Sequence, residues 1–229
     1  MPDKIVVLSG SGLSAESGLP TFRDAAGLWR QYSWMDLASP EGWRKQPQLV
    51  LEFYNERRAK AWAAEPNAAH RAIAALEKDF DVVVVTQNVD NLHERAGSTR
   101  VLHLHGELAY ARGTGPSRRR QRIDGAPIAL GQTCEEGTQL RPDIVWFGEE
   151  TQHMEEAAEH VGNADKVLVV GTSLSVYPAA GLVEFARHGA DKVLNSLEME
   201  SVPAGFDFRA GPATRVVPEI AAGWSALAR

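Results

Sequence analysis

Short apolar runs recur along the chain, and β-branched residues dominate them. They occupy residues 5–8, 82–85, 167–170 and 193–194, with a further candidate at residues 215–217. Segments with helical spacing separate these runs. Apolar strands that alternate with helices are typical of a parallel sheet covered on both faces, because such strands have no solvent-facing side. The pattern predicts an α/β fold, a Rossmann-like doubly wound parallel sheet whose ligands bind beyond the carboxyl ends of its strands.

The connection between the first two runs is far longer than one crossover helix requires. Within it, Ser39 before Pro40 predicts one helix start, and Pro47 opens a second segment of helical spacing. Asn67 is expected to cap a further helix over residues 68–78. This insertion therefore contains part of a second module.

A second insertion, residues 109–140, lacks periodicity and is rich in Gly, Pro, Thr and Arg. Together the two insertions predict a small discontinuous domain beside the sheet, with the active site in the cleft between the two parts. The expected division assigns residues 27–80 and 109–140 to the small domain and residues 1–26, 81–108 and 141–229 to the Rossmann-like domain.

The 229-residue chain has the composition of an ordinary soluble protein, with 44% hydrophobic and 24% charged residues. No apolar run approaches the roughly 20 residues that span a bilayer. No basic region followed by an apolar stretch and a cleavage site opens the chain. We therefore expect a cytoplasmic protein without membrane contact. A single cysteine, Cys134, excludes an internal disulfide.

The formal net charge of −6 argues against general affinity for nucleic acid, because phosphate binding needs a positive surface. The exception is a short basic cluster of Arg118, Arg119, Arg120 and Arg122. Such runs are most often a solvated loop face, which is the interpretation we favour, and contact with an anion or nucleic acid is the alternative.

A glycine turn follows the first apolar run. Gly10, Gly12 and Ala15 fit the Gly-x-Gly-x-x-Gly/Ala spacing of a dinucleotide-binding turn, in which the backbone approaches a pyrophosphate at a helix N-terminus. A tight strand-to-helix turn without a ligand is the alternative, and the spacing alone does not decide between them. Gly18 and Pro20 interrupt the residues that follow, which predicts a loop over the cofactor rather than a long helix.

A segment rich in amide and acid groups, residues 86–90, follows the second apolar run, and His105 lies fifteen residues after Asp90. An imidazole has a reference pKa of about 6.5 and can act as a base near neutral pH. The alternatives are structural. His103 and His105 could be a strand-edge pair bonded to backbone carbonyls, and Asn88 and Asp90 could cap the helix that follows.

Five ordered blocks of the sequence resemble the sirtuins, the NAD-dependent protein deacylases. The matching blocks are GSGLSAESGLPTFRDAAGLW (residues 10–29), TQNVDNLHERAG (86–97), HLHGEL (103–108), PDIVWFGE (142–149) and GTSLSVYPAA (171–180). The resemblance covers nearly the whole chain except residues 111–140. It implies that NAD is the cofactor, that acylated lysine on proteins is the substrate, and that the products are nicotinamide, O-acyl-ADP-ribose and free lysine.

The resemblance also implies roles for single residues. His105 matches the family's catalytic base, Asn88 the position beside the ribose water, and Asp90 the contact to the nicotinamide carboxamide. The remaining nucleotide contacts that it implies are Gly10, Ser11, Gly12, Ser14, Ala15, Glu16, Thr21, Phe22, Arg23, Trp29, Gln87, Val89, Gly171, Thr172, Ser173, Ala213 and either Asn195 or Ser196. Ser11 replaces the alanine usual in the family and adds one hydroxyl near a phosphate.

Two residues on the expected helix after Pro47 bear on the acyl group. Tyr54 and Arg57 lie three apart on one helix face and resemble the Tyr-x-x-Arg pattern of sirtuins that remove succinyl, malonyl or glutaryl groups. A guanidinium can bind a distal carboxylate bidentately, whereas a surface arginine beside a half-buried tyrosine is the alternative. The further substrate contacts that the resemblance implies are a strand edge for an extended acyl-lysine peptide, Val145, Trp146, Phe147, Gly148 and Glu149, together with Val176.

The chain departs from the family between HGEL and PDIVWFGE, where most sirtuins carry two Cys-x-x-Cys-like pairs that bind zinc. Only Cys134 is present there, and no histidine lies between His105 and His153, so a four-ligand thiolate or imidazole site cannot be assembled. We expect no zinc or other metal. The small domain is then held by side-chain packing alone or is partly disordered around residues 113–131.

Three functions are compatible with these features. The leading hypothesis is a lysine deacylase that consumes NAD and acts as a deacetylase and a desuccinylase or demalonylase. NAD hydrolysis or ADP-ribosyl transfer needs the same cofactor site but no acyl-lysine channel. A non-catalytic NAD-binding module is disfavoured because His105, Asn88 and Asp90 are all present. The preferred acyl group, the protein targets and the oligomeric state stay open.

Overall fold

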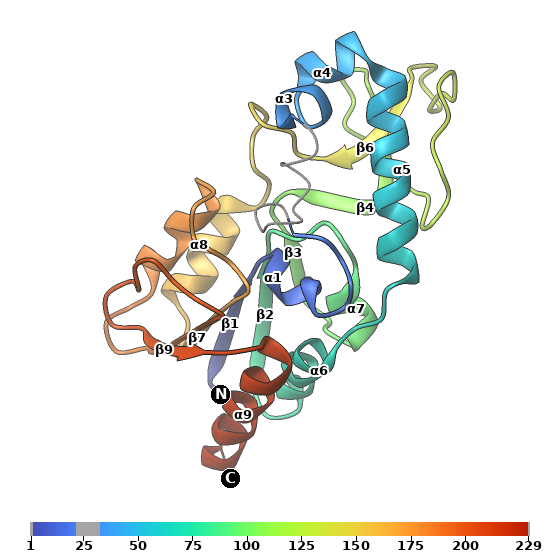
Figure 1. The fold of residues 1–229 in the computed structure, drawn as a ribbon. Coiled ribbons are helices and arrows are strands. Elements are labelled where there is room, and N and C mark those ends of the chain that lie inside the picture. The colour runs from blue at the N-terminus through green and yellow to red at the C-terminus, as the bar shows by residue number, and fades with distance from the viewer. Residues whose placement is uncertain (1, 22–32, 229) are drawn as a thin grey trace.

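The computed structural model describes residues 2–21 and 33–228. Its larger part is a six-stranded sheet in the order β3-β2-β1-β7-β8-β9, in which every neighbouring pair is parallel (Figure 1). The strands are β1 (Lys4–Ser9), β2 (Asp81–Thr86), β3 (Val101–His103), β7 (Lys166–Val170), β8 (Asp191–Ser196) and β9 (Asp207–Ala210). The helices that pack on their faces are α6 (Ala68–Ala75), α8 (Met154–Gly162), η2 (Ala179–Phe185) and α9 (Ala213–Leu227). The expected α/β fold with a doubly wound parallel sheet is confirmed.

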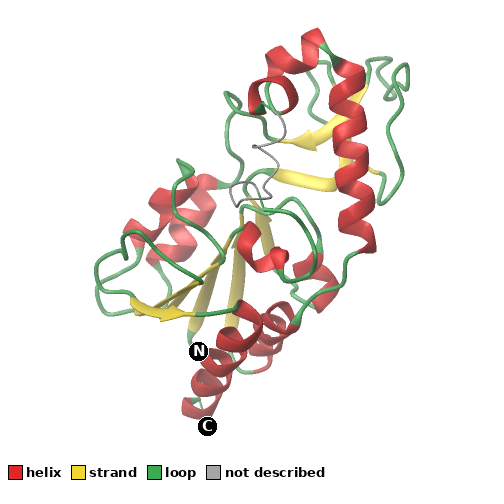
Figure 2. Ribbon diagram, in the orientation of Figure 1, coloured by secondary structure: helices red, strands yellow, loops and turns green. Residues whose placement is uncertain are grey.

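Both faces of the sheet are covered, because successive residues of a strand point to opposite sides. On β1, Ile5 and Val7 face a core shared with α6 and α9. Val6 and Leu8 face the opposite core, shared with α8 and the 3-10 helix η2. Figure 2 shows these helices on both sides of the strands. Burial on both sides explains why the strands are continuous apolar runs in the sequence.

One strand expectation is wrong. Residues 215–217 lie in α9, where Ala213, Val217, Ala221 and Trp224 recur at helical spacing and pack on the sheet. The short apolar run is one turn of this buried helix face. The structure instead adds to this sheet two strands that no apolar run marked, the three-residue β3 and also β9, whose residues are largely exposed.

A second, smaller part of the molecule lies beyond the carboxyl edge of the sheet, at the top of Figure 1, and we call it the small module. It consists of α3 (Trp34–Leu37), α4 (Pro40–Lys45), α5 (Pro47–Ala63) and an antiparallel sheet of β4 (Gly106–Gly113), β5 (Arg120–Arg122) and β6 (Leu140–Ile144), in the order β5-β4-β6. The helix starts are as expected: Ser39 accepts the N–H of Gly42, and Pro47 occupies the first turn of α5. None of the helices in the described residues has both the length and the apolar character needed to cross a membrane.

The division between the two parts differs from the expected one at both insertions. Helix α6, capped by Asn67 as expected, belongs to the large sheet, because its Ala69 and Ile73 lie in the core with β1 and β2. Strands β4 and β6 cross the expected boundaries, because antiparallel pairing holds them in one sheet. Among the described residues, the small module therefore comprises 33–63 and 106–144.

Candidate active site

Loops that leave the carboxyl ends of β1 and β7 pack directly on each other. The glycine turn after β1 leads into α1 (Ser11–Ala15), and the N–H of Gly12 donates to the Gly171 carbonyl oxygen at 2.8 Å. A Cβ at Gly12 would lie 2.8 Å from that oxygen, and a Cβ at Gly171 would lie 2.2 Å from the Leu13 nitrogen. Gly171 also has a φ of +63°. The glycines are therefore required by the contact between the two loops.

Asn88 is the centre of hydrogen bonds that join the loop after β2 to the glycine turn. Its Nδ2 donates to the Gly10 carbonyl oxygen and to Ser14 Oγ, both at 3.1 Å. Ser14 Oγ in turn donates to Asp90 Oδ2 at 3.0 Å. The side chains of Ser14, Asn88 and Asp90 are all buried. The amide and the carboxylate that follow β2 are thus fixed against the glycine turn.

Asp90 also has the structural role that the helix-cap alternative assigned to it. Its Oδ1 accepts the N–H of Leu92 at the start of α7 (Leu92–Ala96), at 3.2 Å. Burial raises the pKa of Asp90, and the hydrogen bonds from Leu92 and Ser14 oppose that shift. One carboxylate therefore caps a helix and anchors Ser14 at the same time.

His105 follows the end of β3, beside the loop after β2. Its Nδ1 lies 3.2 Å from the Gln87 carbonyl oxygen. Because a carbonyl oxygen only accepts, Nδ1 donates this bond, and in the neutral ring Nε2 then has the lone pair. Burial lowers the pKa of His105, and the bond to Gln87 opposes that shift only in part. The imidazole is therefore neutral at pH 7, as a proton acceptor must be.

Gln87 connects this loop to the turn after β7. Its Nε2 donates to Thr172 Oγ1 at 3.2 Å. Loops from β1, β2 and β7 are thus linked to one another, so the predicted convergence of site residues at one sheet edge is what the structure shows. The structural alternative for the histidines is also present, since both His103 and His105 contact backbone carbonyls of the loop after β2.

One cavity lies between this sheet edge and α5 of the small module. From the sheet edge it is lined by Ser11, Ser14, Asn88 and Asp90, with Val89. From α5 it is lined by Phe53, Arg57 and Lys60. Five of the residues expected to hold a nucleotide and the arginine expected to hold an acyl carboxylate therefore line one cavity, whereas His105 is not among its lining residues.

Tyr54 and Arg57 differ in their surroundings although they lie on one face of α5. Tyr54 is buried in the core of the small module with Val89 and Trp146, and burial raises its pKa to about 12. Arg57 is partly buried, and its guanidinium lies 5.6 Å from the centre of the Phe53 ring. Burial lowers the pKa of Arg57, and the nearby Tyr54 and Asp90 oppose that shift. A placement on the cavity wall favours the acyl-pocket hypothesis over a surface arginine.

Glu16 joins the glycine turn to the C-terminal helix. Its Oε1 accepts the N–H of Ala213 at 2.6 Å and that of Thr214 at 3.4 Å, at the start of α9. The Thr214 hydroxyl also donates to this carboxylate. The backbone N–H of Ala213, expected to meet an adenine, is therefore already bonded within the chain.

Asn195 and Ser196 differ in their access to a ligand. Asn195 is buried, and its Nδ2 donates to the carbonyl oxygens of Arg209 and Gly211 at 2.7 and 3.1 Å. Ser196 is partly exposed, and its Oγ donates to the Glu198 carbonyl oxygen. Of the two candidates for an adenosine contact, Ser196 is the more accessible.

The other expected nucleotide contacts divide by location. Ala15 and Thr21 are partly exposed, and Ser173 is exposed with its Oγ 2.6 Å from Ser175 Oγ. The expectations for Phe22, Arg23 and Trp29 fall outside the described residues.

The expectation of a strand edge over residues 145–149 is wrong. Strand β6 ends at Ile144, and a turn follows in which the Glu149 N–H donates to the Trp146 carbonyl oxygen. The Glu149 side chain stabilises this turn, because its carboxylate accepts the Trp146 N–H at 2.9 Å and two bonds from Arg141. The chain therefore forms a turn stabilised by the Glu149 carboxylate directly after β6, and not an extended strand.

Two further backbone N–H groups of this turn, beyond those of Trp146 and Glu149, are already bonded. Val145 donates to the His105 carbonyl oxygen at 2.9 Å, and Phe147 donates to that of Ala38 at 2.9 Å. Gly148 has a φ of +90°, and Val176, on another loop, is partly buried. The bond to His105 ties the expected substrate loop directly to the expected base.

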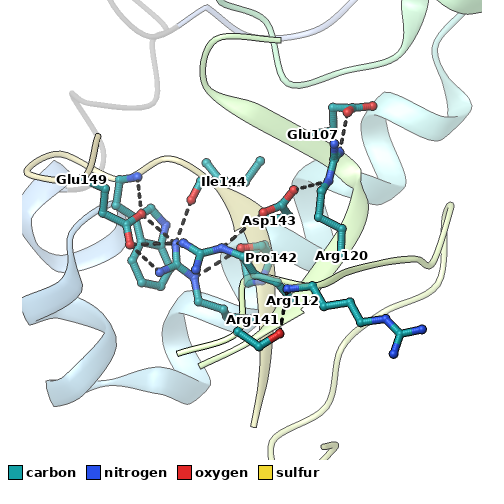
Figure 3. A network of polar contacts seen from close by, with 11 residues as sticks. Glu107, Arg112, Arg120, Arg141, Pro142, Asp143, Ile144 and Glu149 are labelled. Atoms are coloured by element: carbon teal, nitrogen blue, oxygen red, sulfur yellow. Dashed lines mark hydrogen bonds and ion pairs between the residues drawn. The ribbon is translucent and has the colours of Figure 1, made fainter. Parts of the chain in front are cut away.

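A chain of ion pairs holds the small module together (Figure 3). Arg141 bonds Glu149 at 2.7 Å, and Arg112 reaches the same carboxylate at 3.3 Å. Arg112 and Arg120 then flank Asp143, at 3.2 and 2.6 Å. Arg141 and Asp143 are 5% and 2% exposed, so this network lies inside the module.

All four arginines of the basic cluster are exposed, as the solvated-face interpretation expects. Arg120 nevertheless pairs with Asp143 and Glu107 and stacks on Tyr110, with 4.0 Å between the guanidinium and the ring centre. Arg119 and Arg122 also pair with carboxylates, at 2.7 and 2.6 Å. These bonds to acids within the chain disfavour the anion-contact alternative.

The irregular segment between β5 and β6 packs on a small apolar cluster. Leu51, Ala111, Ile128 and Leu140 form this cluster, with Cys134 at its margin. The Cys134 Sγ lies 3.3 Å from Thr138 Oγ1. Both apolar packing and the ion pairs therefore stabilise the segment between β5 and β6, whose sequence shows no helical or strand periodicity.

Sequence reasoning missed a group of polar residues behind the site. Ser9 Oγ donates to Thr86 Oγ1 at 2.8 Å and lies 2.9 Å from His93 Nε2. Thr86 Oγ1 also accepts the N–H of Asn88 at 3.0 Å. The signal in the sequence was a polar residue at the end of an otherwise apolar strand. Ser9 is the last residue of β1, and Thr86 is the last residue of β2. These residues hold the loop that carries Asn88.

Comparison with known proteins identifies the family. The Sir2 family model matches residues 10–178. An NAD-dependent protein deacylase of Helicobacter pylori is 51% identical over 186 residues, which cover 81% of this chain and 79% of that protein. An NAD-dependent protein deacylase of Vibrio cholerae is 44% identical over 223 residues, covering 94% and 91%. The crystal structure of a Sir2 homologue–NAD complex superposes with a TM-score of 0.88 at 37% identity, covering 100% of this chain and 91% of that one. From the matched motifs and the shared fold, this chain belongs to the Sir2 family.

Proposed function

We propose that this chain is an NAD-dependent protein-lysine deacylase, which transfers the acyl group of a modified lysine to ADP-ribose and releases nicotinamide. The proposal rests mainly on one observation. Ser14, Asn88 and Asp90 line one cavity and are hydrogen-bonded to one another, and the loop that carries Asn88 and Asp90 also bonds the neutral His105 through Gln87. Relatives that cover most of the chain are NAD-dependent protein deacylases. A Sir2 structure with a deacetylated p53 peptide, 28% identical with a TM-score of 0.80 over 96% of this chain and 92% of that one, supports acylated proteins as the substrate class.

The residues present fit NAD. Ser14, Asn88 and Asp90 are buried polar groups beside a cavity, and a ligand with amide and hydroxyl groups can bond them there. When bound, NAD supplies a ribose carbon that loses nicotinamide and a hydroxyl that receives the acyl group. Asp90, held by Ser14, is the residue that would contact the carboxamide.

His105 and Asn88 have separate tasks in this scheme. Burial keeps His105 neutral, so its Nε2 can take the proton of a ribose hydroxyl as that hydroxyl attacks. Bonds to the Gly10 carbonyl oxygen and to Ser14 Oγ fix the Asn88 side chain, so its amide is held against the glycine turn. A pre-positioned amide orients a polar ligand group without paying ordering entropy during the reaction.

Arg57 gives the enzyme its acyl preference. As a cation on the cavity wall, it can bind the distal carboxylate of a succinyl or malonyl group, while Tyr54 remains a neutral phenol at all physiological pH values because its pKa is about 12. We therefore expect desuccinylation to exceed deacetylation in kcat/KM.

Mass spectrometry of the products formed from NAD with acetyl-lysine and succinyl-lysine peptides tests both statements. Arg57→Met should reduce succinyl removal about 10- to 100-fold, the value of a lost charge-assisted hydrogen bond, with a smaller effect on acetyl removal. Lys60→Met is the matched control, because Lys60 lines the same cavity outside the Tyr-x-x-Arg pair. Equal losses for both acyl groups in Arg57→Met would refute the preference.

The same experiment separates deacylation from the second candidate activity. A deacylase releases nicotinamide in proportion to acyl peptide and forms O-acyl-ADP-ribose. Nicotinamide release that is independent of peptide, with free ADP-ribose as the product, would identify an NAD glycohydrolase instead.

The small module is proposed to do without zinc. The support is chemical: Cys134 is the single cysteine of the chain, and its Sγ packs against Gly113 and Thr138. The ion pairs around Asp143 and Glu149 supply cross-links of the kind a metal would otherwise provide. Stoichiometric zinc in the purified protein would overturn this. The expectations of a cytoplasmic protein without nucleic-acid partners stay predictions.

A further inference from the structure

A second histidine lies behind the expected base, and acceptors bond both of its ring nitrogens. His103 ends β3 and is 5% exposed. Its Nδ1 lies 2.9 Å from the Asn88 carbonyl oxygen, and its Nε2 lies 2.8 Å from Glu94 Oε1 on α7. A carbonyl oxygen and an ionised carboxylate only accept, so each ring nitrogen must carry a proton. His103 is therefore an imidazolium, although His105 two residues later is neutral.

The charges around His103 agree with this state. Glu94 from α7 and Glu107 from β4 face it, with Glu107 Oε2 4.0 Å from Nε2, and Asp90 and the neutral His93 lie nearby. Burial alone would lower the pKa of His103, but the hydrogen bond and the charge of Glu94, together with Glu107, raise it overall. In return, the bond from His103 lowers the pKa of Glu94 against the effect of burial.

Glu94, His103 and Glu107 could also be taken for a metal site, since their ligand atoms lie within 4.8 Å of one another. The hydrogen bonds argue otherwise. An imidazolium has no lone pair for a metal, and Glu107 also pairs with Arg120 of the small module. The group is an ion-pair cluster centred on a cation.

We propose that His103 is a positioning residue for the reaction: as an imidazolium it fixes the Asn88 carbonyl and so holds the loop that presents Asn88 and Asp90 to the cavity. This inference rests on the proposed function, because it assumes that these two residues bind the nucleotide. The Asn88 N–H is bonded to Thr86 Oγ1, so His103 holds the other side of the same peptide segment.

Loss of the proton from His103 has a defined consequence. A neutral ring has one acceptor nitrogen, which must then face either the Asn88 carbonyl or Glu94. The remaining ring proton stays on Nε2, because its bond to the charged Glu94 carboxylate is the stronger of the two. Nδ1 then has no proton to donate, and the Asn88 carbonyl is released. Activity should therefore fall at alkaline pH as His103 deprotonates, whereas the acid limb belongs to protonation of His105.

The test follows kcat/KM against pH and, in the same proteins, the ring nitrogen signals of His103 and the backbone amide signals of Asn88 and Asp90 by NMR. Glu94→Gln removes the nearest negative charge and should move the alkaline limb down by about one pH unit or more. Glu107→Gln should move it less and in the same direction. Glu65→Gln is the control, because Glu65 pairs with Arg95 of the same helix α7 but is exposed.

The outcomes are distinct. The proposal expects a protonated His103 ring at pH 7, loop amide signals that titrate with it, and both transitions shifted together by Glu94→Gln with an unchanged acid limb. A neutral His103 ring at pH 7, or an alkaline limb that Glu94→Gln leaves in place, overturns it. The NMR titration needs no turnover. A chain without NAD-dependent deacylation would refute the proposed function, and the loop signals would still decide the role of His103.

Discussion

The carboxyl edge of the large sheet and the small module are stabilised by different means. At the sheet edge, apolar strands end in single polar residues, and glycines bring Gly12 and Gly171 into direct contact. In the small module, Arg141, Arg112 and Asp143 form an internal ion-pair network beside a small apolar cluster. The groups proposed to react thus lie on a hydrophobic scaffold, and the loop expected to meet the substrate is held by ion pairs.

This difference predicts that changes at the sheet edge act on chemistry, whereas changes in the module act on stability. Substitution of His105 gives the largest expected effect on the first side. His105→Ala should lower kcat/KM for deacylation by about 10²- to 10⁴-fold, the usual contribution of a general base. Its side chain bonds the Gln87 backbone and, among the described residues, holds no other loop in place, so NAD affinity and the unfolding midpoint should change little.

Isothermal calorimetry with NAD and denaturant unfolding of His105→Ala check these two controls beside the rate. Unimpaired turnover would remove His105 from the role of base. A large loss of stability in His105→Ala would show instead that His105 is needed for folding as well as for the reaction.

Arg141 gives the largest expected effect on the second side. Arg141→Met removes bonds to Glu149 and to the Ile144 carbonyl oxygen and leaves a partly buried carboxylate without its main cation. The free energy of unfolding should fall by about 3 kcal/mol, the usual cost of breaking a buried ion pair from one side.

Denaturant unfolding measures this change. Arg119→Met is the matched control, because the Arg119–Glu135 pair is exposed and such pairs contribute about 0–1 kcal/mol. Equal losses of unfolding free energy in the two variants would contradict the idea that the ion-pair network inside the small module stabilises it in place of a metal.

The buried histidines give the third effect, an acid sensitivity of the large sheet that is absent at neutral pH. Burial lowers the pKa of His70 to about 4 and that of His93 well below its usual value. Between about pH 6.5 and pH 4 the unfolded chain therefore binds protons that the folded chain does not, so stability falls as pH falls, by at most about 1.4 kcal/mol per pH unit for each histidine.

His103 has the opposite sign, since its raised pKa means that its contribution is present at low pH and is lost as pH rises through that value. Denaturant unfolding from about pH 9 down to pH 4 checks both statements, because the His103 contribution is lost on the alkaline side and the His70 and His93 effects appear on the acid side. His70→Gln should reduce the acid slope, and an unchanged slope would show that His70 titrates normally in the folded protein.

Local patterns in the sequence were sufficient where a single segment determines its own structure. The valine runs of β2 and β7 predicted buried strands, and Ser39 and Asn67 marked helix starts that the structure contains. The alternation of strands and helices also predicted that ligands bind beyond the carboxyl ends of the strands, and the loops after β1, β2 and β7 are hydrogen-bonded to one another there.

The failures involve contacts between distant residues. The run at residues 215–217 has the same apolar composition as a strand, and only its packing on the sheet makes it helical. The turn at residues 145–149 depends on the Glu149 carboxylate, which accepts the Trp146 N–H and is held in place by Arg141. The acidic partners of Arg120, Glu107 and Asp143, were not predicted because they lie far from it in the sequence. The state of His103 likewise depends on acceptors at Asn88 and Glu94.

The most direct test of the account is a crystal structure of the protein with NAD and an acyl-lysine peptide. The account predicts that His105 keeps its Nδ1 on the Gln87 carbonyl and places Nε2 within about 3 Å of a ribose hydroxyl, a hydrogen-bond distance. A His105 ring turned away from the sugar, with the peptide present, would contradict it.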